Sequence, residues 1–263
     1  MEQVLSSDGT AIVFDRTGDG PPLILVGGAL QHRAVDTSTS RLAALLAPRL
    51  TVFHYDRRGR GDSGDTAPYA VEREVEDLGA LIDEAGRWAF LYGMSSGAAL
   101  ALEAAARGLA ATKLALYEPP FVLDNDRPGT PEDFPTKLAE LTSAGRRGDA
   151  VEFFLTEGPG MPAEAIAQMR QTAIWPQFEA VAHTLAYDTT IMADQESLLA
   201  ERVPSVTAPT LLIDGGASPA WPRNAVRTLA DKLPHAHRRT LEGETHAVAP
   251  ELLAPVLVEF FVG

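Results

Sequence analysis

The chain has 263 residues, of which 45% are hydrophobic and 22% charged, and this length is sufficient for one large core or for a core with a smaller appended unit. The net charge of −14 disfavours binding to nucleic acid or to anionic membranes, and the dense basic cluster Arg57-Arg58-Gly59-Arg60 is short. Without cysteine the chain has no disulfide, no thiolate metal site and no cysteine nucleophile.

Along the chain, short β-rich runs alternate with longer segments rich in alanine and leucine. This alternation is typical of strands that cross over through helices into a largely parallel sheet. The expected strands are Ala11 to Phe14, Leu23 to Val26, Thr51 to Tyr55, Trp88 to Tyr92, Lys113 to Tyr117, Thr210 to Ile213 and His237 to Leu241. Helical spacing predicts helices at Glu72 to Ala85, Ser96 to Arg107, Arg223 to Lys232 and Ala249 to Phe261. The fold class expected is therefore α/β, a doubly wound and mostly parallel sheet.

One stretch, from about Phe121 to Asp194, breaks this alternation, because it has helical patterns, no convincing strand, and punctuation by proline and glycine. We expect an inserted helical cap at 121–194, and a core made of 1–120 and 195–263. Three amphipathic segments would either shelter a cleft in the core or add packing only: Asp149 to Leu155, Ala163 to Arg170 and Gln177 to Tyr187.

The pentapeptide Gly93-Met94-Ser95-Ser96-Gly97 follows the expected strand that ends at Tyr92. A serine at the centre of a tight turn between a strand and a helix is the pattern of a nucleophile elbow. Glycine is needed on both sides because the serine backbone is strained and the strand folds back closely against the helix. Ser95 is centred between the glycines, so we interpret it as the nucleophile in preference to Ser96.

The chain resembles the α/β-hydrolase family, and the resemblance runs nearly from end to end. The run from Leu23 to Ala29 is similar to the family's strand and oxyanion loop, and the run from Tyr55 to Ser63 to its D-x-R-G-x-G-x-S turn. The elbow follows, and His246 lies beyond the last expected strand, where the family has its catalytic base. The resemblance implies a serine hydrolase in which His246 takes the proton of Ser95.

A third member, a carboxylate that orients the histidine, is missing from its usual place. In most of the family it is an aspartate in a G-x-x-D pattern after the last strand but one, whereas Gly215-Gly216-Ala217-Ser218 ends in a serine. Glu118, at the end of the strand after the elbow helix, is the preferred candidate, since some family members carry their acid at this strand end. Asp214 is the alternative.

An oxyanion hole needs two backbone N–H donors that point at the developing negative charge. By resemblance these donors are Ala29 and Ser96. Gly27 stands where the family's loop usually has histidine. We expect this departure to alter the packing of the loop and to leave both N–H groups available.

Other polar residues have plainer interpretations. His32 and His183 are candidates for substrate contact, but we expect ordinary surface or hydrogen-bonded histidines. We expect Asp56 and Arg58 to tie loops together. The acidic residues of the helix that begins at Glu72 are expected to form a solvated face: Glu72, Glu74, Glu76 and Asp77.

We therefore predict an enzyme that hydrolyses a small-molecule ester, lactone or related carbonyl substrate through an acyl-enzyme. Perhydrolase-like or carbon–carbon hydrolase activity, and a non-catalytic ligand-binding role, are the alternatives. No cofactor, metal, nucleic-acid or membrane partner is expected. No stretch is apolar enough to span a membrane and no signal peptide is evident, so a cytoplasmic location is expected. Substrate identity and oligomeric state stay open.

Overall fold

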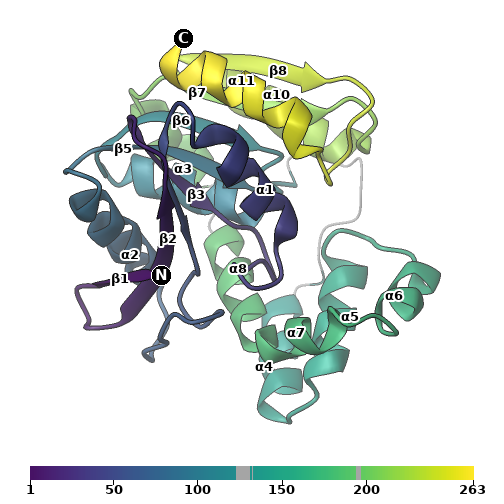
Figure 1. The fold of residues 1–263 in the computed structure, drawn as a ribbon. Coiled ribbons are helices and arrows are strands. Elements are labelled where there is room, and N and C mark those ends of the chain that lie inside the picture. Colours follow the sequence, from purple (N-terminus) through teal and green to yellow (C-terminus); the bar gives the residue numbers. More distant parts are fainter. Residues whose placement is uncertain (123–130, 132, 194–196) are drawn as a thin grey trace.

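A computed structural model describes residues 1–122, 131, 133–193 and 197–263. Its described part contains an eight-stranded sheet in the order β1-β2-β4-β3-β5-β6-β7-β8 (Figure 1). The strands are β1 (Glu2–Leu5), β2 (Ala11–Thr17), β3 (Pro22–Val26), β4 (Thr51–Tyr55), β5 (Ala89–Met94), β6 (Ala111–Tyr117), β7 (Thr210–Gly215) and β8 (Ala236–Leu241). The pairs β1–β2 and β2–β4 are antiparallel and the others are parallel. The predicted α/β fold with a mostly parallel sheet is confirmed.

Helices cover both faces of the sheet because successive residues of the buried strands point to opposite sides. In β3, Ile24 and Val26 pack on one core cluster, whereas Leu23 and Leu25 pack on the other. The first cluster includes residues of α2 (Val71–Glu84), α3 (Ser96–Ala106) and α10 (Ala220–Lys232). The second includes residues of α1 (Thr37–Leu46) and α11 (Pro250–Val262), which lie side by side in Figure 1.

The order in which the chain adds strands to the sheet reverses at β3. After β3 the chain adds β4 on one side, then returns through α2 to add β5 on the other side. Parallel strands share their carboxyl edge, and a reversal of strand order opens a crevice there. Val26, at the end of β3, pairs with Gly93 near the end of β5. The loop after β3 and the turn after β5 are therefore neighbours.

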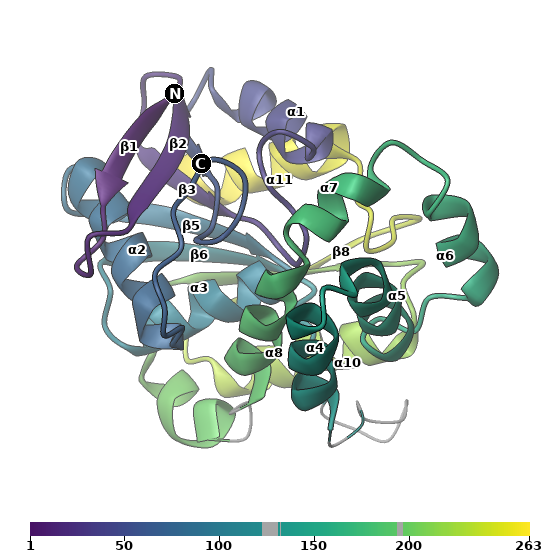
Figure 2. The same ribbon diagram turned by 90° about the horizontal axis from the view of Figure 1, so that it is seen from below.

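A helical insertion separates β6 from β7. Its described residues include α4 (Phe134–Ser143), α5 (Arg147–Glu157), α6 (Ala163–Met169), α7 (Trp175–Ala180), a 3-10 turn (Ala182–Thr184) and α8 (Leu185–Ala193). Figure 2 shows these helices gathered at one end of the molecule, beside the sheet. They have a third apolar cluster of their own, which also includes Leu30 of the loop after β3. This contact joins the helical insertion to the edge where β3 ends.

Several details differ from the sequence expectation. Strand β1 and helix α1 were not predicted, and the amphipathic segment from Gln177 to Tyr187 is divided between α7, the 3-10 turn and α8. A π-helical turn (Leu198–Arg202) and a 3-10 turn (Val203–Ser205) lead from the helical insertion back to β7. The predicted limits of the cap fall beside or on 123–130 and 194–196, which lie outside the described residues. None of the helices in the described ranges has both the length and the apolar character needed to cross a lipid bilayer.

Candidate active site

Ser95 occupies the sharp turn between β5 and α3. Its backbone has φ 55° and ψ −127°, a conformation that residues with a side chain rarely adopt and that costs on the order of 1–3 kcal/mol. A Cβ atom built on Gly93 would lie 2.5 Å from the Gly97 carbonyl oxygen, and one built on Gly97 would lie 2.2 Å from the Val26 carbonyl oxygen. Both glycines are therefore required by space, which confirms the strand, turn and helix setting predicted for Ser95.

Glu118 and His246 are brought together although 128 positions separate them in the chain. Glu118 follows β6 and is fully buried, and its Oε2 lies 2.7 Å from His246 Nδ1. A carboxylate can only accept, so Nδ1 carries the proton and Nε2 is left as the acceptor. The N–H of Ser95 donates to the Tyr117 carbonyl oxygen at 2.9 Å, and Glu118 is the next residue. The elbow and the Glu118–His246 pair therefore share the carboxyl edge of β5 and β6.

The hydroxyl of Ser95 has no hydrogen-bond partner within the described residues. Among the same residues, His246 bonds to Glu118 alone. The His246 side chain is 49% exposed, and Ser95 is partly exposed. Hydrogen bonds between a nucleophile and its base are often formed fully only when substrate binds.

The alternative acid, Asp214, and the serine in the usual place of the family's acid, Ser218, have different surroundings from Glu118. Asp214, in β7, is buried and accepts from Thr240 Oγ1 at 2.8 Å and from Arg223 Nε at 3.2 Å, so its carboxylate is used away from His246. Ser218, in the usual place of the family's aspartate, is buried near Glu118, and its hydroxyl makes no hydrogen bond of normal geometry within the described chain.

Glu118 is held in its ionised form by its surroundings. Burial raises the pKa of this carboxyl, but the hydrogen bond with His246, the nearby Ser218 hydroxyl and the N–H of Gly215, at 2.9 Å from Oε1, outweigh burial. The pKa of Glu118 is therefore lowered, and at neutral pH the group is an anion that can stabilise an imidazolium.

The loop after β3 carries the first expected oxyanion donor, Ala29. The N–H of Gly28 is taken by the Gln31 side chain, which also packs beside Gly27, whereas the N–H of Ala29 has no acceptor within the described residues. Gln31 in turn donates to Asp36 Oδ2 at 2.8 Å. It therefore braces the loop that lacks the usual histidine, a role that the sequence did not suggest.

Ser96 is the first residue of α3, and its N–H likewise has no backbone acceptor in the described structure. Unpaired N–H groups in the first turn of a helix favour negative charge. Both predicted donors, Ala29 and Ser96, are thus free to bind an anion.

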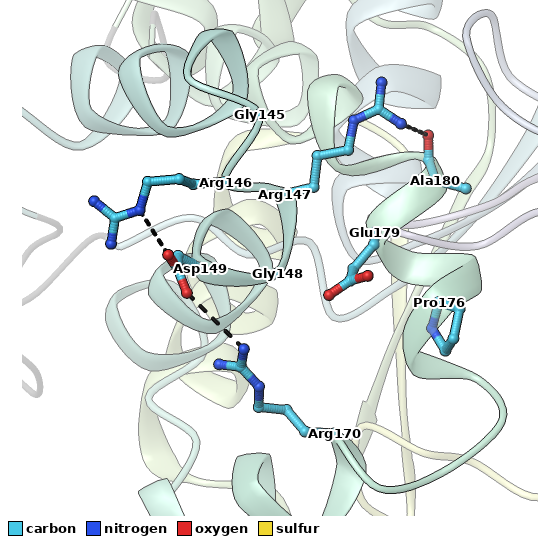
Figure 3. A pocket seen from close by; sticks show the side chains of 9 residues that line it. All are labelled: Gly145, Arg146, Arg147, Gly148, Asp149, Arg170, Pro176, Glu179 and Ala180. Carbon is cyan, nitrogen blue, oxygen red and sulfur yellow. Dashed lines mark hydrogen bonds and ion pairs between the residues drawn. The ribbon is translucent and has the colours of Figure 1, made fainter.

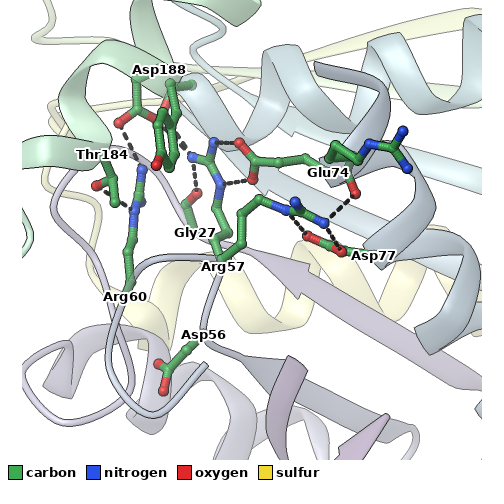
Figure 4. A network of polar contacts seen from close by, with 12 residues as sticks. Gly27, Asp56, Arg57, Arg60, Glu74, Asp77, Thr184 and Asp188 are labelled. Carbon is green, nitrogen blue, oxygen red and sulfur yellow. Dashed lines mark hydrogen bonds and ion pairs between the residues drawn. The ribbon is translucent and has the colours of Figure 1, made fainter. Parts of the chain in front are cut away.

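Buried ion pairs lie against the loop after β3, where Arg57 and Arg60 bind the Gly27 and Gly28 carbonyl oxygens, and they correct one sequence expectation. Glu74 and Asp77 of α2 were expected on a solvated face, but both are buried (2% and 1% exposed). Glu74 binds Arg57, and Asp77 binds Arg58, through two hydrogen bonds of 2.7–2.8 Å each (Figure 4). The predicted role of Arg58 in tying loops together is confirmed by its further bond to Asp8 at 3.0 Å.

Two further members of this network, Thr184 and Asp188, come from the helical insertion. Asp188 of α8 binds Arg57 and Arg60 at 2.7 Å each, and it also accepts from Ser96 Oγ at 2.7 Å. Asp188 and Thr184 carried no signal in the sequence, because more than 120 residues separate them from the arginines. The sequence signal that could have indicated this network was the spacing of Glu74 and Asp77, which lie three positions apart in the helix that follows Arg57-Arg58-Gly59-Arg60.

The two candidate histidines have different surroundings. His32 is 6% exposed, neither ring nitrogen has a hydrogen-bond partner among the described residues, and burial lowers its pKa. His183 lies 3.5 Å from Asp65, and burial lowers its pKa also. The expectation of an exposed or hydrogen-bonded residue is therefore wrong for His32.

Two cavities are notable. One, of about 210 Å³, is lined by Met94 and Ala247, the chain neighbours of Ser95 and His246, and by residues of α1 and α11 such as Leu42 and Leu253. The other, of about 440 Å³, is an open polar hollow in the helical insertion, lined by Arg146, Arg147, Arg170 and Glu179 (Figure 3). Among the described residues there is no cluster of three or more histidines and carboxylates that could hold a metal ion.

Comparison with known proteins establishes the family. The family model described as "Alpha/beta hydrolase family" matches residues 23–256, so the chain belongs to the α/β-hydrolase family. A solved α/β hydrolase from Sphaerobacter thermophilus DSM 20745 is 57% identical, with a TM-score of 0.93 over 99% of this chain and 100% of that one.

One further relative and one structural neighbour are named as esterases. The pimeloyl-[acyl-carrier protein] methyl ester esterase of Xanthomonas axonopodis pv. citri (strain 306) is 30% identical over 244 residues, covering 89% of this chain and 91% of that protein. The esterase EaEST from Exiguobacterium antarcticum shares the fold, with 18% identity and a TM-score of 0.72 over 98% of each chain. The chain is therefore an enzyme of the hydrolase type.

Proposed function

We propose that this enzyme is a serine hydrolase that cleaves a small-molecule carboxylic ester or lactone through an acyl-enzyme. The observation that carries the proposal is the hydrogen bond between buried Glu118 and His246 at the carboxyl edge that also bears Ser95. A neutral serine is a poor nucleophile, and a histidine oriented by a carboxylate is the arrangement that activates it.

In this mechanism His246 Nε2 takes the proton of Ser95 Oγ as the oxygen attacks the ester carbonyl. The N–H groups of Ala29 and Ser96 bind the negative charge that develops on the carbonyl oxygen. The tetrahedral intermediate expels the alcohol, which receives the proton from His246. Water then attacks the acyl-enzyme with the same histidine as base, and Glu118 stabilises the imidazolium in both halves.

The substrate class is supported by two observations. The name of the relative that is 30% identical describes it as a methyl ester esterase, and the largely apolar cavity of about 210 Å³ lined by Met94 and Ala247 suits a small apolar group. We further propose that residues 121–194 are a cap on a core of 1–120 and 195–263, because the helical insertion contacts the oxyanion loop through Leu30.

Labelling with a fluorophosphonate probe tests the proposal. We expect stoichiometric labelling of the wild-type protein at pH 8, none with Ser95→Ala, and unchanged labelling with Ser205→Ala, which alters an exposed serine elsewhere. A folded wild-type protein that resists the probe would contradict the proposal and favour a non-catalytic ligand-binding role. A panel of esters, lactones and carbon–carbon substrates then identifies the reaction of the labelled enzyme.

A further inference from the structure

Arg60 lies in the turn between β4 and α2 and is 1% exposed. All three of its guanidinium nitrogens are used: Nη1 donates to the Gly28 carbonyl oxygen at 2.6 Å, Nη2 to Asp188 Oδ2 at 2.7 Å and Nε to Thr184 Oγ1 at 3.0 Å. Figure 4 shows Arg60 between Thr184 and Asp188, with Arg57 beside it. Two residues of the helical insertion therefore set the position of a cation behind the oxyanion loop.

The carbonyl that Arg60 binds belongs to the same peptide unit as the N–H of Ala29. This peptide bond is trans, and in a trans peptide the C=O and N–H bonds point in opposite directions. A guanidinium fixed on the oxygen side therefore directs the N–H of Ala29 away from the arginine. On this loop, a Cβ built at Gly28 would lie 3.1 Å from Ser95 Cβ, so the peptide runs directly past the nucleophile.

The charge of Arg60 also acts on the strength of this donor. Hydrogen bonds polarise one another through a peptide group, and the effect is larger where water is excluded. A cation bound to the carbonyl oxygen draws electron density from the peptide and makes its N–H a stronger donor. The second expected donor residue is held by the same anion, because Ser96 Oγ donates to Asp188 Oδ1 at 2.7 Å.

We infer that Arg60 is a positioning residue for the oxyanion hole: it orients and polarises the Gly28–Ala29 peptide, and Asp188 of the helical insertion holds its guanidinium in place. This inference rests on the proposed function. Arg60 does not touch the substrate in this scheme, and it acts through the N–H of Ala29 alone. The helical insertion thereby acts on the oxyanion hole through Arg60.

Arg58 offers a matched control. It lies in the same turn, is equally buried, and binds Asp77, Asp8 and the Arg73 carbonyl oxygen, but it makes no bond to the oxyanion loop within the described structure. A purely structural role for Arg60 would make the two arginines equivalent in their effect on the reaction. Substitution by lysine keeps the charge of either residue and loses the planar fork that binds several partners at once.

The test compares Arg60→Lys and Arg60→Met with Arg58→Lys, using p-nitrophenyl acetate as the substrate. For both Arg60 variants we expect the rate constant of acylation to fall about 10- to 100-fold, part of the loss seen when an oxyanion donor is removed entirely. Binding of the ester ground state should change by less than about twofold, because the donor acts mainly on the developing charge. Arg58→Lys should keep acylation within about threefold of wild type.

A trifluoromethyl ketone gives the second measurement, since it adds to the nucleophilic serine and places a negative oxygen in the oxyanion hole. Its affinity should weaken in the Arg60 variants by the same factor as acylation and stay unchanged in Arg58→Lys. If Arg60→Met does not fold, as judged by thermal unfolding, Arg60→Lys alone decides. Wild-type acylation and ketone affinity in Arg60→Lys, or equal losses in Arg58→Lys, would overturn the inference. A wild-type protein inert to fluorophosphonate would instead overturn the proposed function on which it rests.

Discussion

At the scale of single residues, the two strand ends beside the candidate site are both strained. Ser95 follows β5 with φ 55°, and Glu118 follows β6 with φ 43°, although neither is glycine. Positive φ at residues with side chains costs stability and persists where the surroundings determine the backbone. Here the bond from Ser95 N–H to the Tyr117 carbonyl joins the two strained turns. The nucleophile candidate and the acid candidate are thus positioned by one local arrangement of backbone.

The first prediction separates the two acid candidates. Glu118→Gln should lower kcat about 10²- to 10⁴-fold, because an amide facing His246 favours the wrong tautomer and cannot stabilise the imidazolium. Asp214→Asn should leave kcat per active site within about threefold, since Asp214 bonds to Thr240 and Arg223 instead. Steady-state hydrolysis of p-nitrophenyl acetate, with active sites counted by fluorophosphonate titration, measures both. Collapse of turnover in Asp214→Asn alone would contradict the assignment of Glu118.

At the scale of the element, the junction of β5 and α3 is limited by backbone contacts. A side chain on Gly97 would meet the carbonyl oxygens of Val26 and Gly27 at 2.2 and 2.6 Å. Backbone atoms cannot move aside as a flexible side chain can, so the strand and the helix would have to separate. The loop after β3, which carries the candidate oxyanion donor Ala29, would be displaced at the same time.

The second prediction uses this junction. Gly97→Ala should destabilise the protein by more than about 2 kcal/mol through overpacking and abolish fluorophosphonate labelling. The control is Gly79→Ala in α2, where a Cβ meets nothing within 4 Å and φ is not positive. That substitution should stabilise the helix by about 0.5–1 kcal/mol and leave labelling unchanged. Urea unfolding measures both, and tolerance of Gly97→Ala would refute the proposed crowding.

The third prediction concerns α2, whose buried face carries charge. Glu74→Gln should lower the free energy of unfolding by about 3–5 kcal/mol, because it removes one partner of a buried ion pair and leaves Arg57 undercompensated. Glu76→Gln, on the same helix but in a partly exposed pair with Arg73, should change it by less than about 1 kcal/mol. Urea unfolding of the two variants makes the comparison. Equal, small effects would show that the Glu74–Arg57 pair does little for stability.

At the scale of the whole molecule, the helical insertion and the sheet are joined by buried charge as well as by apolar contact. Asp188 and Thr184 bind Arg60, and Asp65 accepts from Tyr187 at 2.8 Å. Burial raises the pKa of Asp188, but Arg60, Arg57 and the hydrogen bond from Ser96 outweigh burial and lower it. The attachment of the helical insertion therefore depends on the ionised carboxylate of Asp188.

The fourth prediction is a loss of stability in acid that has two phases. Burial lowers the pKa of His32, His54 and His183, so below the ordinary histidine pKa of about 6.5 the unfolded chain binds protons that the folded protein resists, and stability falls as the pH decreases. Lowered pKa values of Asp188 and Glu118 add a second loss below about pH 4, where unfolded carboxyls become protonated.

Urea unfolding between pH 8 and pH 3 measures this dependence. His54→Gln is the informative variant, because it removes one of the buried groups whose protonation opposes folding, and it should flatten the phase between pH 7 and pH 5. Asp77 acts in the opposite sense, since burial raises its pKa despite the bonds from Arg58. Stability that is constant from pH 7 to pH 5 would contradict the histidine contribution.

Much of the fold could be predicted from the sequence, because the apolar spacing within each core segment matches the strand or helix that the segment forms. All the predicted strands are present, and the helices of the core differ from prediction mainly at their ends. The edge strand β1 was missed because it is short and mostly exposed, so its sequence Glu2-Gln3-Val4-Leu5 shows no alternation of apolar and polar residues. In the helical insertion, the amphipathic segment from Gln177 to Tyr187 is helical in separate pieces, and the turn from Ala182 to Thr184 brings Thr184 and Asp188 to Arg60.

By itself the sequence determined the α/β class, because strands and helices each impose their own spacing on apolar residues. It also determined the tight turn at Ser95, because that turn requires glycine on both sides, and it named the polar groups at the carboxyl ends of the strands. Tertiary structure alone decided which of them meet. The sequence left Glu118 and Asp214 as rivals, and strand pairing placed one against His246 and the other against Thr240. It also turned Glu74 and Asp77 from an expected solvated face into buried partners of arginine. Charge in a sequence has no partner until folding removes water and brings distant residues within hydrogen-bonding distance.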